Sequence, residues 1–229
     1  MAVADLSELI AEHRTLQEIV YETIRQAVLN GTFTPGSPLR QETLAQKLKV
    51  SSMPVREALR RLEAEGLVTF KARRGAIVKP LDPKEADDVF LVRTLLEPTA
   101  ARLATPNLQT DQLMTLQDIC ARLDDATSAN DRKAFLEHDR EFHHSLYSVV
   151  NQPVLISMIR QLWDRSEIYR TAAVYTSAPR YHLQQSQAEH HALLQACIHG
   201  DGDEAERATR AGLEISAAHF KNALKELFA

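Results

Sequence analysis

From residue 84 to the end of the chain, apolar residues recur at the three-to-four-residue spacing of α-helices, and no strand pattern interrupts them. Short segments rich in Pro, Gly, Asn and Ser separate six amphipathic stretches. These stretches span residues 84–104, 110–127, 131–150, 154–174, 180–199 and 203–227. Helices joined by loops this short pack side by side in alternating directions. We therefore expect an antiparallel six-helix bundle over residues 81–229.

The first 80 residues follow a different pattern. Helical periodicity covers residues 15–30, 41–48 and 53–65, and then the apolar spacing changes. The segments LVTF and AIVK, joined by a loop that contains Gly75, predict a two-stranded hairpin. Helix, short helix, turn, helix and hairpin is the order of a winged helix-turn-helix. The whole chain is therefore predicted to be mainly α, with a winged helix-turn-helix domain over residues 1–80 followed by the helical bundle.

Charge is distributed unevenly between the two predicted domains. The 229-residue chain has a net charge of -4, but residues 40–80 hold ten Lys and Arg against four Glu. Residues 81–229 hold fifteen Lys and Arg against twenty-two Asp and Glu. A basic segment joined to an acidic body suits a protein that binds nucleic acid through one part only.

Cellular location and redox state follow from two simpler observations. No apolar run approaches the roughly 20 residues of a transmembrane helix, and the first residues lack the pattern of a signal peptide. A cytoplasmic protein without a membrane partner is therefore expected. Cys120 and Cys197 form no CxxC pair, and each falls within a helical pattern, which predicts buried free thiols.

The third helix of the N-terminal domain carries the expected DNA contacts. A recognition helix must present long hydrogen-bond donors near its N-terminus to the major groove. Arg56 lies one turn into this helix, opposite the apolar stripe, and has no acidic residue three or four positions away. Arg61 is ambiguous, because Glu57 lies four residues before it. The predicted DNA-binding residues are Arg40, Ser51, Ser52, Arg56, Arg60, Arg73, Arg74 and Gly75.

These residues have different expected roles. Ser51 and Ser52 are suited to capping the helix or to binding phosphate or base. Arg60 lies further along the helix, where contact with the DNA backbone is favoured. Arg73 and Arg74 flank the hairpin tip, placed to reach an adjacent minor groove or phosphates. An exposed basic hairpin without a function is the alternative for this pair.

Polar residues interrupt the apolar face of the third bundle helix. Asp139 and His143 are four residues apart and share the face of Phe135 and Phe142. Burying a carboxylate and an imidazole without partners costs several kcal/mol, so something must satisfy them. His190 falls on the apolar stripe of the fifth bundle helix. The three side chains suit a divalent metal; the alternative is a hydrogen-bonded Asp–His pair in the core.

Longer strings connect the chain with a known family. VSSMPVREALRRLEAEGLVTFKARRGAIV resembles the DNA-binding domain of the GntR superfamily of bacterial regulators. The strings VRTLLEPTAARLA, DREFHHSLYSVVNQPVL and EHHALLQACIHGDGDEAERA resemble the FCD effector domain of its FadR-type branch. The first resemblance implies that Arg56 reads a base and that Gly75 with its arginines forms a DNA-contacting wing.

The FCD resemblance implies a small-molecule site. In many such domains a zinc-like metal lies at the floor of a cavity for small carboxylates, and Asp139, His143 and His190 match three of its ligands. The fourth ligand position falls at Gly212, which has no side chain to offer. Two interpretations stay open: three protein ligands with water, or a metal-free pocket that binds the effector directly. Arg93 is expected either to bind an acidic effector or to pair with Glu97.

Together these features predict a sequence-specific transcriptional regulator and not an enzyme. A homodimer would bind two-fold operator DNA, and a small organic acid would modulate that binding. The chain has no nucleophile elbow, phosphate loop or HExxH helix, which disfavours the alternative of a metal-dependent hydrolase. A sequence pI near 6.1 disfavours an architectural protein that binds any DNA.

Overall fold

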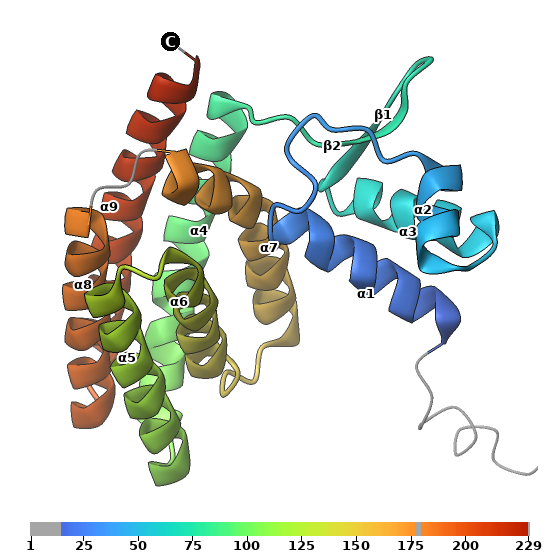
Figure 1. Ribbon diagram of the computed structural model, residues 1–229. Coiled ribbons are helices and arrows are strands. Elements are labelled where there is room, and N and C mark those ends of the chain that lie inside the picture. The colour runs from blue at the N-terminus through green and yellow to red at the C-terminus, as the bar shows by residue number, and fades with distance from the viewer. Residues whose placement is uncertain (1–14, 177–179, 229) are drawn as a thin grey trace, which may run out of the picture. The chain divides into compact units, whose positions relative to one another are not determined.

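The computed structural model describes residues 15–176 and 180–228, which divide into two compact units, one ending at Pro80 and one beginning at Leu81 (Figure 1). The first unit contains α1 (Leu16–Leu29), α2 (Gln41–Leu48), α3 (Ser52–Ala64), β1 (Val68–Lys71) and β2 (Gly75–Val78). The second contains α4 (Pro83–Ala104), the 3-10 turn η1 (Thr105–Asn107), α5 (Thr110–Ala129), α6 (Arg132–Tyr147), α7 (Pro153–Thr176), α8 (Arg180–His199) and α9 (Gly202–Phe228). The predicted fold class, a winged helix-turn-helix and an all-helical bundle, is confirmed.

The hairpin of the first unit is held by a third segment of chain. β1 and β2 pair antiparallel, and the backbone preceding α2 lies along the other edge of β2. Leu39 N donates to Ala76 O at 2.8 Å, and Val78 N donates to Ser37 O at 2.9 Å. The sequence predicted only a connector here, because Pro35, Gly36 and Pro38 oppose regular structure. These bonds fix the base of the hairpin to the helical core.

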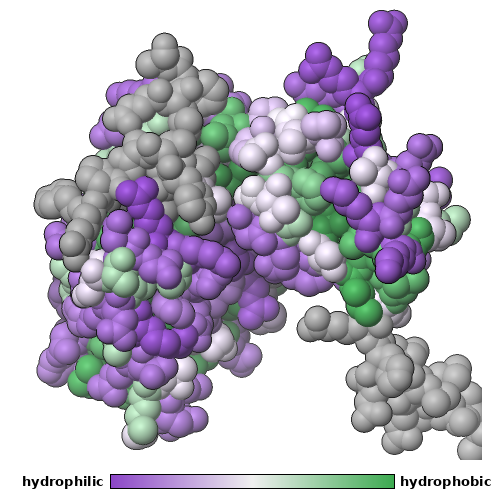
Figure 2. Space-filling view, viewed as in Figure 1, coloured by the Kyte–Doolittle hydropathy of each residue, from purple (hydrophilic) through white to green (hydrophobic). Residues whose placement is uncertain are grey.

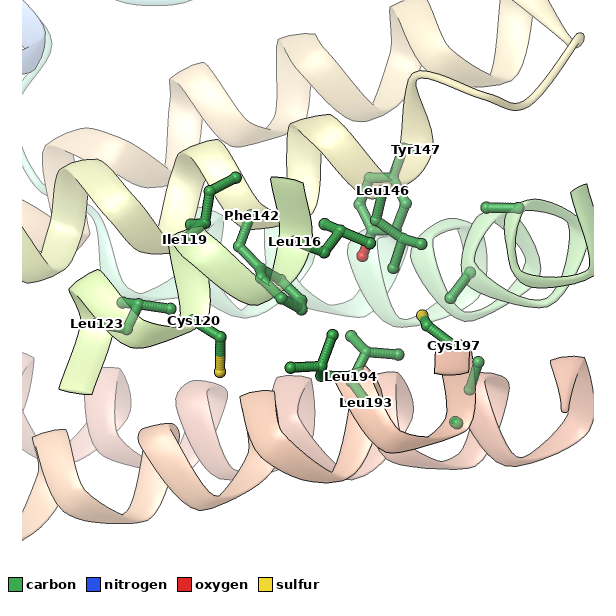
Figure 3. Packing of buried hydrophobic residues seen from close by; sticks show 14 of the residues in the cluster. Leu116, Ile119, Cys120, Leu123, Phe142, Leu146, Tyr147, Leu193, Leu194 and Cys197 are labelled. Carbon is green, nitrogen blue, oxygen red and sulfur yellow. The ribbon is translucent and has the colours of Figure 1, made fainter. Parts of the chain in front are cut away.

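Helices of the second unit alternate in direction, as the sequence predicted (Figure 1). α5 packs on α6 and α8, while α4 packs on α7 and α9. The core between α5, α6 and α8 is apolar (Figure 3). α6 ends at Tyr147, although helical spacing continues to Val150 in the sequence. A helix could not continue through Gln152 in any case, because Pro153 restricts the residue before it to extended backbone.

A proline inside α4 is compensated by α9. Pro98 is buried within the 22-residue helix and has no N–H to donate to the carbonyl of Thr94. Nη1 of Arg210, from α9, donates to that carbonyl oxygen at 3.1 Å. Nη2 of the same guanidinium contacts Glu206 at 3.1 Å. Arg210 therefore supplies the donor that the helix lacks and joins two long helices of the bundle.

We expect Arg210→Ala to lower the free energy of unfolding by about 1 kcal/mol, because a partly buried carbonyl loses its donor. In a Pro98→Ala background the loss should be smaller, since the new backbone N–H reaches the Thr94 carbonyl. Arg207→Ala is the matched control, because Arg207 pairs only with Glu204 on the protein surface. Urea unfolding measures each of these proteins beside the parent. An equal loss from Arg210→Ala in the parent protein and in the Pro98→Ala background would contradict the assignment.

Candidate functional site

α2 and α3 form a tight helix-turn-helix. The turn is made by Lys49, whose backbone adopts φ 55 and ψ 41, the left-handed conformation that closes a helix. Nε2 of Gln41 donates to the carbonyl oxygen of Ser52 at 2.9 Å, which joins the N-terminal ends of the two helices. The start of α3 is therefore positioned by α2.

α3 buries one face and exposes its arginines on the other. Val55, Leu59 and Leu62 are 0–2% exposed. Arg56 and Arg60 lie on the exposed side, and within the described part of the chain the ion pair of each is a long contact with Glu57, at 3.4 Å and 3.9 Å. Contacts of this length in solvent contribute little free energy, so both guanidiniums are available to another partner.

The serines at the start of α3 are exposed, and Arg40 is exposed at the N-cap of α2. Ser51 is the N-cap residue of α3, with extended backbone at φ -68 and ψ 163, but its side chain makes no capping hydrogen bond. Of the two roles expected for Ser51, capping is therefore not used, and the binding of phosphate or base stays a prediction.

The hairpin tip is exposed and basic. Arg73 and Gly75 both adopt left-handed backbone, at φ 66 and φ 71, and Arg74 lies between them. All three residues are exposed, and Figure 2 shows a hydrophilic surface at this end of the hairpin. Glycine tolerates the left-handed conformation without strain, which explains its place in the turn. The turn thus presents two arginine side chains to solvent.

Arg61 has a structural partner that the sequence did not predict. Its Nε lies 3.3 Å from Oε1 of Glu65, four residues later, and not beside Glu57. Its guanidinium carbon also lies 3.6 Å from the ring centroid of Tyr21 on α1. The hydroxyl of Tyr21 donates to Glu65 at 2.8 Å. The arginine, tyrosine and glutamate fix α1 to the end of α3, which explains the choice of Glu65 over Glu57.

The second unit brings Asp139, His143 and His190 together. One ligand atom from each residue lies within 4.8 Å of the others. Nε2 of His190 is 2.9 Å from Oδ1 of Asp139, and Nε2 of His143 is 3.8 Å from the same oxygen. Asp139 is 7% exposed and His190 is 4% exposed. The three residues therefore form one buried cluster between α6 and α8.

Hydrogen bonds orient both imidazoles toward Asp139. Nδ1 of His190 lies 2.7 Å from the carbonyl oxygen of Ser186, which can only accept, so this nitrogen carries a proton. Nδ1 of His143 lies 3.2 Å from the hydroxyl of Tyr147. That hydroxyl donates to Glu97 at 3.1 Å, and its oxygen therefore accepts from His143. In the neutral rings both Nε2 lone pairs face the same carboxylate.

Protonation differs between the two histidines. Burial lowers the pKa of His143 to about 3, so this ring is neutral. Burial opposes the protonation of His190 too, but the adjacent Asp139 carboxylate outweighs it and raises the pKa of His190. Although burial opposes ionisation of Asp139, the Arg170 guanidinium holds the pKa of its carboxyl far below the usual range. Without a metal, the cluster is thus an ionised carboxylate between the Arg170 guanidinium and a His190 ring whose protonation that carboxylate favours.

A divalent metal fits these donors. Although Nε2 of His190 is 2.9 Å from Asp139, this buried atom makes no hydrogen bond of acceptable geometry to any residue that the structure describes. Histidines that bind metals have the other ring nitrogen fixed by a second partner, as both have here. Oδ1 of Asp139 faces the two rings, while Oδ2 contacts Arg170. One carboxylate oxygen and two Nε2 atoms therefore remain for an ion.

Gly212, where a fourth ligand was expected, faces the carboxyl group of Glu189. A Cβ at this position would lie 3.1 Å from Oε2 of Glu189. Oε1 of Glu189 is buried and has no hydrogen-bond partner among the described residues, and burial raises the pKa of this carboxyl to about 7. The space that a longer residue at 212 would enter is thus bordered by an acidic group from α8.

Arg170, on α7, was missed by the sequence analysis. It is 6% exposed and contacts both Asp139 and Glu167. Its guanidinium carbon lies 4.7 Å from the ring centroid of Trp163. Because Trp163 and Arg170 are seven residues apart, they share one face of α7. A charged residue on the face of a buried tryptophan was the signal that could have identified it.

Arg93 pairs with Glu97, one of its two expected roles. Its Nε lies 2.5 Å from Oε1 of Glu97, and its Nη1 donates to Ser166 at 3.1 Å. Arg93 is 4% exposed and Glu97 is 0% exposed. The guanidinium carbon lies 4.3 Å from the centroid of the Trp163 ring, which Arg170 also contacts. Tyr147 bonds Glu97, so this pair and the Asp139 cluster form one polar network.

We expect Arg170→Met to lower the free energy of unfolding of chelator-treated protein by about 3–5 kcal/mol, because it leaves the Asp139 carboxylate short of a buried partner. Asp139→Asn combined with Arg170→Met should recover part of this loss. Thermal unfolding of the single and double variants gives the coupling energy between the two residues. A double variant whose loss equals the sum of the single losses would refute the pairing.

No helix among the described residues is long and apolar enough to cross a membrane.

Residues 16–78 match the family of bacterial regulatory proteins named gntR, and residues 88–214 match the FCD domain. These two matches correspond to the two compact units.

Known proteins agree with these matches. The chain is 30% identical over 154 residues to the HTH-type transcriptional regulator McbR of Escherichia coli K12, which covers 67% of this chain and 70% of McbR. It is 29% identical over 221 residues to the galactonate operon transcriptional repressor of the same organism, covering 87% and 94%. The solved structure of E. coli McbR/YncC superposes with a TM-score of 0.83 at 26% identity, covering 92% and 99%. This chain therefore belongs to the GntR family of bacterial transcriptional regulators, in the FadR-type branch that carries an FCD domain.

Proposed function

We propose that this regulator binds a specific operator as a homodimer, and that a small carboxylate bound in the FCD domain changes its affinity for that DNA. In this proposal residues 1–80 bind DNA, while residues 81–229 bind the effector and supply dimer contacts. The observation that carries this proposal is that one chain combines two features. Its α3 exposes arginines, and its FCD domain buries the cluster of Asp139, His143 and His190.

The proposed DNA contact uses the exposed face of α3. Arg56 lies in the first turns of the helix, where a recognition helix reaches base edges, and its ion pair with Glu57 is long and solvated. Arg60 lies one turn later and is suited to a phosphate. At the hairpin tip, Arg73 and Arg74 are suited to phosphates or to a narrow minor groove, where the potential is most negative. Arg40, Ser51 and Ser52 would position the helix on the backbone.

The proposed effector site has positive charge held near a buried carboxylate. Arg170 neutralises Asp139, and a metal bound by Asp139, His143 and His190 would add positive charge for the oxygens of an organic acid. Because the protein groups are already ionised or fixed by hydrogen bonds, they need little rearrangement when an anion enters. Arg93 places a second guanidinium against the Trp163 ring, beside Arg170. The carboxylate of Glu97 neutralises the charge of Arg93.

Regulation requires a difference in binding between two states. An effector changes DNA affinity only if it binds one arrangement of the DNA-binding units more tightly than another. A two-fold dimer converts such a change into a different spacing of two recognition helices, and half-site spacing determines operator affinity. The site would thus control transcription without any contact between effector and DNA.

We expect Arg56→Ala to weaken binding to DNA selected by the protein from a random pool by about 1–3 kcal/mol, with a much smaller loss on unselected DNA. A base contact is lost only on the selected sequence, which explains the difference. Fluorescence anisotropy at fixed salt measures both affinities. Lys133→Ala, which removes an exposed cation of the FCD domain, is the control. An equal loss on both DNAs would exclude a base-reading role for Arg56.

We expect Asp139→Asn to abolish the rise in melting temperature that organic acids cause with divalent metal present, while binding to the selected DNA is retained. A ligand that binds the folded state raises the melting temperature by mass action, so a screen of small carboxylates detects it. His143→Gln is a second variant, which removes the imidazole but keeps the ion pair between Asp139 and Arg170. If both variants respond to the same acids as the parent protein, the effector binds elsewhere.

A further inference from the structure

A second group of metal-ligating side chains lies between α5 and α8, apart from the Asp139 cluster. Sγ of Cys120 is 3.6 Å from Nδ1 of His191, and Nε2 of His191 is 3.0 Å from Oδ1 of Asp124. One ligand atom from each of the three residues lies within 4.8 Å of the others. Because His191 follows His190, the two rings leave α8 about 100° apart. His190 therefore contacts Asp139, whereas His191 contacts Asp124.

The spacing of these residues keeps them together. Cys120 and Asp124 are four residues apart, so both lie on the face of α5 that packs on α8. Figure 3 shows Cys120 on α5 with its sulfur directed away from the α5 backbone, in the core region that α8 borders. Nε2 of Gln187, one turn before His191 on α8, donates to Oδ1 of Asp124 at 2.5 Å. This amide orients the carboxylate, as outer partners do at metal sites.

The donor set selects a particular class of ion. A thiolate, an imidazole and a carboxylate together are the ligands of Zn²⁺ and of ions that replace it, such as Co²⁺. At zinc bond lengths two ligand atoms on one ion lie roughly 3–4 Å apart. The distance from Sγ to Nδ1 of His191 falls in this range. The Asp124 carboxylate contacts the other ring nitrogen, Nε2, so it must turn toward Nδ1 to share the same ion. Ca²⁺ and Mg²⁺ prefer oxygen and would not use the cysteine.

The cysteine of this group is buried, while the aspartate and the histidine are partly exposed to solvent. Cys120 is 2% exposed, whereas the side chains of Asp124 and His191 are 38% and 48% exposed. An ion can therefore reach the sulfur from solvent between the two outer residues, with water at the fourth position. Burial raises the pKa of the Cys120 thiol to about 11, so metal binding must release its proton to solvent.

We propose that Cys120, Asp124 and His191 form a second, zinc-type metal site that connects α5 to α8. This inference does not depend on the effector site, which contains no thiol. Nor does it depend on DNA binding. A bound ion would connect two helices that both contribute residues to the apolar core, and it would stabilise the folded protein by mass action.

Titration of the reduced, full-length protein with Co²⁺ tests the proposal. A bond between cobalt and a thiolate gives an ultraviolet charge-transfer band that nitrogen and oxygen ligands do not give. We expect this band in the parent protein and in Asp139→Asn, its loss in Cys120→Ser, and its retention in Cys197→Ser. Cys197 is the matched control, since it is equally buried but contacts only the Thr105 hydroxyl among the described polar side chains.

His191→Gln keeps the thiol and tests the ligand set. We expect it to weaken the cobalt complex at least about tenfold, because one of three protein ligands is lost. No charge-transfer band in the parent protein would overturn the proposal, and so would a band that survives Cys120→Ser. An unchanged affinity for Co²⁺ in His191→Gln would show that His191 is not a ligand, and the three-residue site would then be excluded.

Discussion

The carboxylate of Asp139 is the group around which the FCD domain is organised. It is buried on the apolar face of α6, and an unpaired charge there would cost several kcal/mol. Arg170 from α7 and His190 from α8 supply the compensating contacts, so three helices meet at one group. The orientation of His143 through Tyr147 extends the network to Glu97 and Arg93 on α4. Residues of four helices, α4, α6, α7 and α8, therefore belong to one polar network around this carboxylate.

Much of the fold was predictable because it is local. Hydrophobic spacing and the turn residues between helices identified all six bundle helices and the hairpin, with ends within a few residues of those observed. The features that were missed depend on residues far apart in the chain. The pairing of the segment around Pro38 with β2 and the bond from Arg210 to the Thr94 carbonyl are two such cases. Neither leaves a periodic signal in the sequence.

The candidate sites divide in the same way. Asp139, His143 and His190 were identifiable because they interrupt apolar stripes, and the resemblance to FCD domains strengthened their assignment as metal ligands. Arg170 lies 31 residues from Asp139, and only the packing of α7 on α6 brings the two together. The sequence also left Arg93 between two roles, and its burial beside Glu97 and Ser166 decided for the ion pair. For Arg61 the sequence left an ion pair with Glu57 and a phosphate contact open, and it gave no sign of the contact with Tyr21 on α1.

The central claim is that the FCD site and the DNA-binding face are energetically linked, and linkage is reciprocal. If an acid changes the affinity for DNA by a given factor, the DNA must change the affinity for that acid by the same factor. Calorimetric titration of a stabilising acid into metal-loaded protein, with and without its selected DNA, measures this factor directly. We expect the two acid affinities to differ by the same factor as the DNA affinities measured with and without the acid. Identical acid affinities in the two titrations would exclude the linkage.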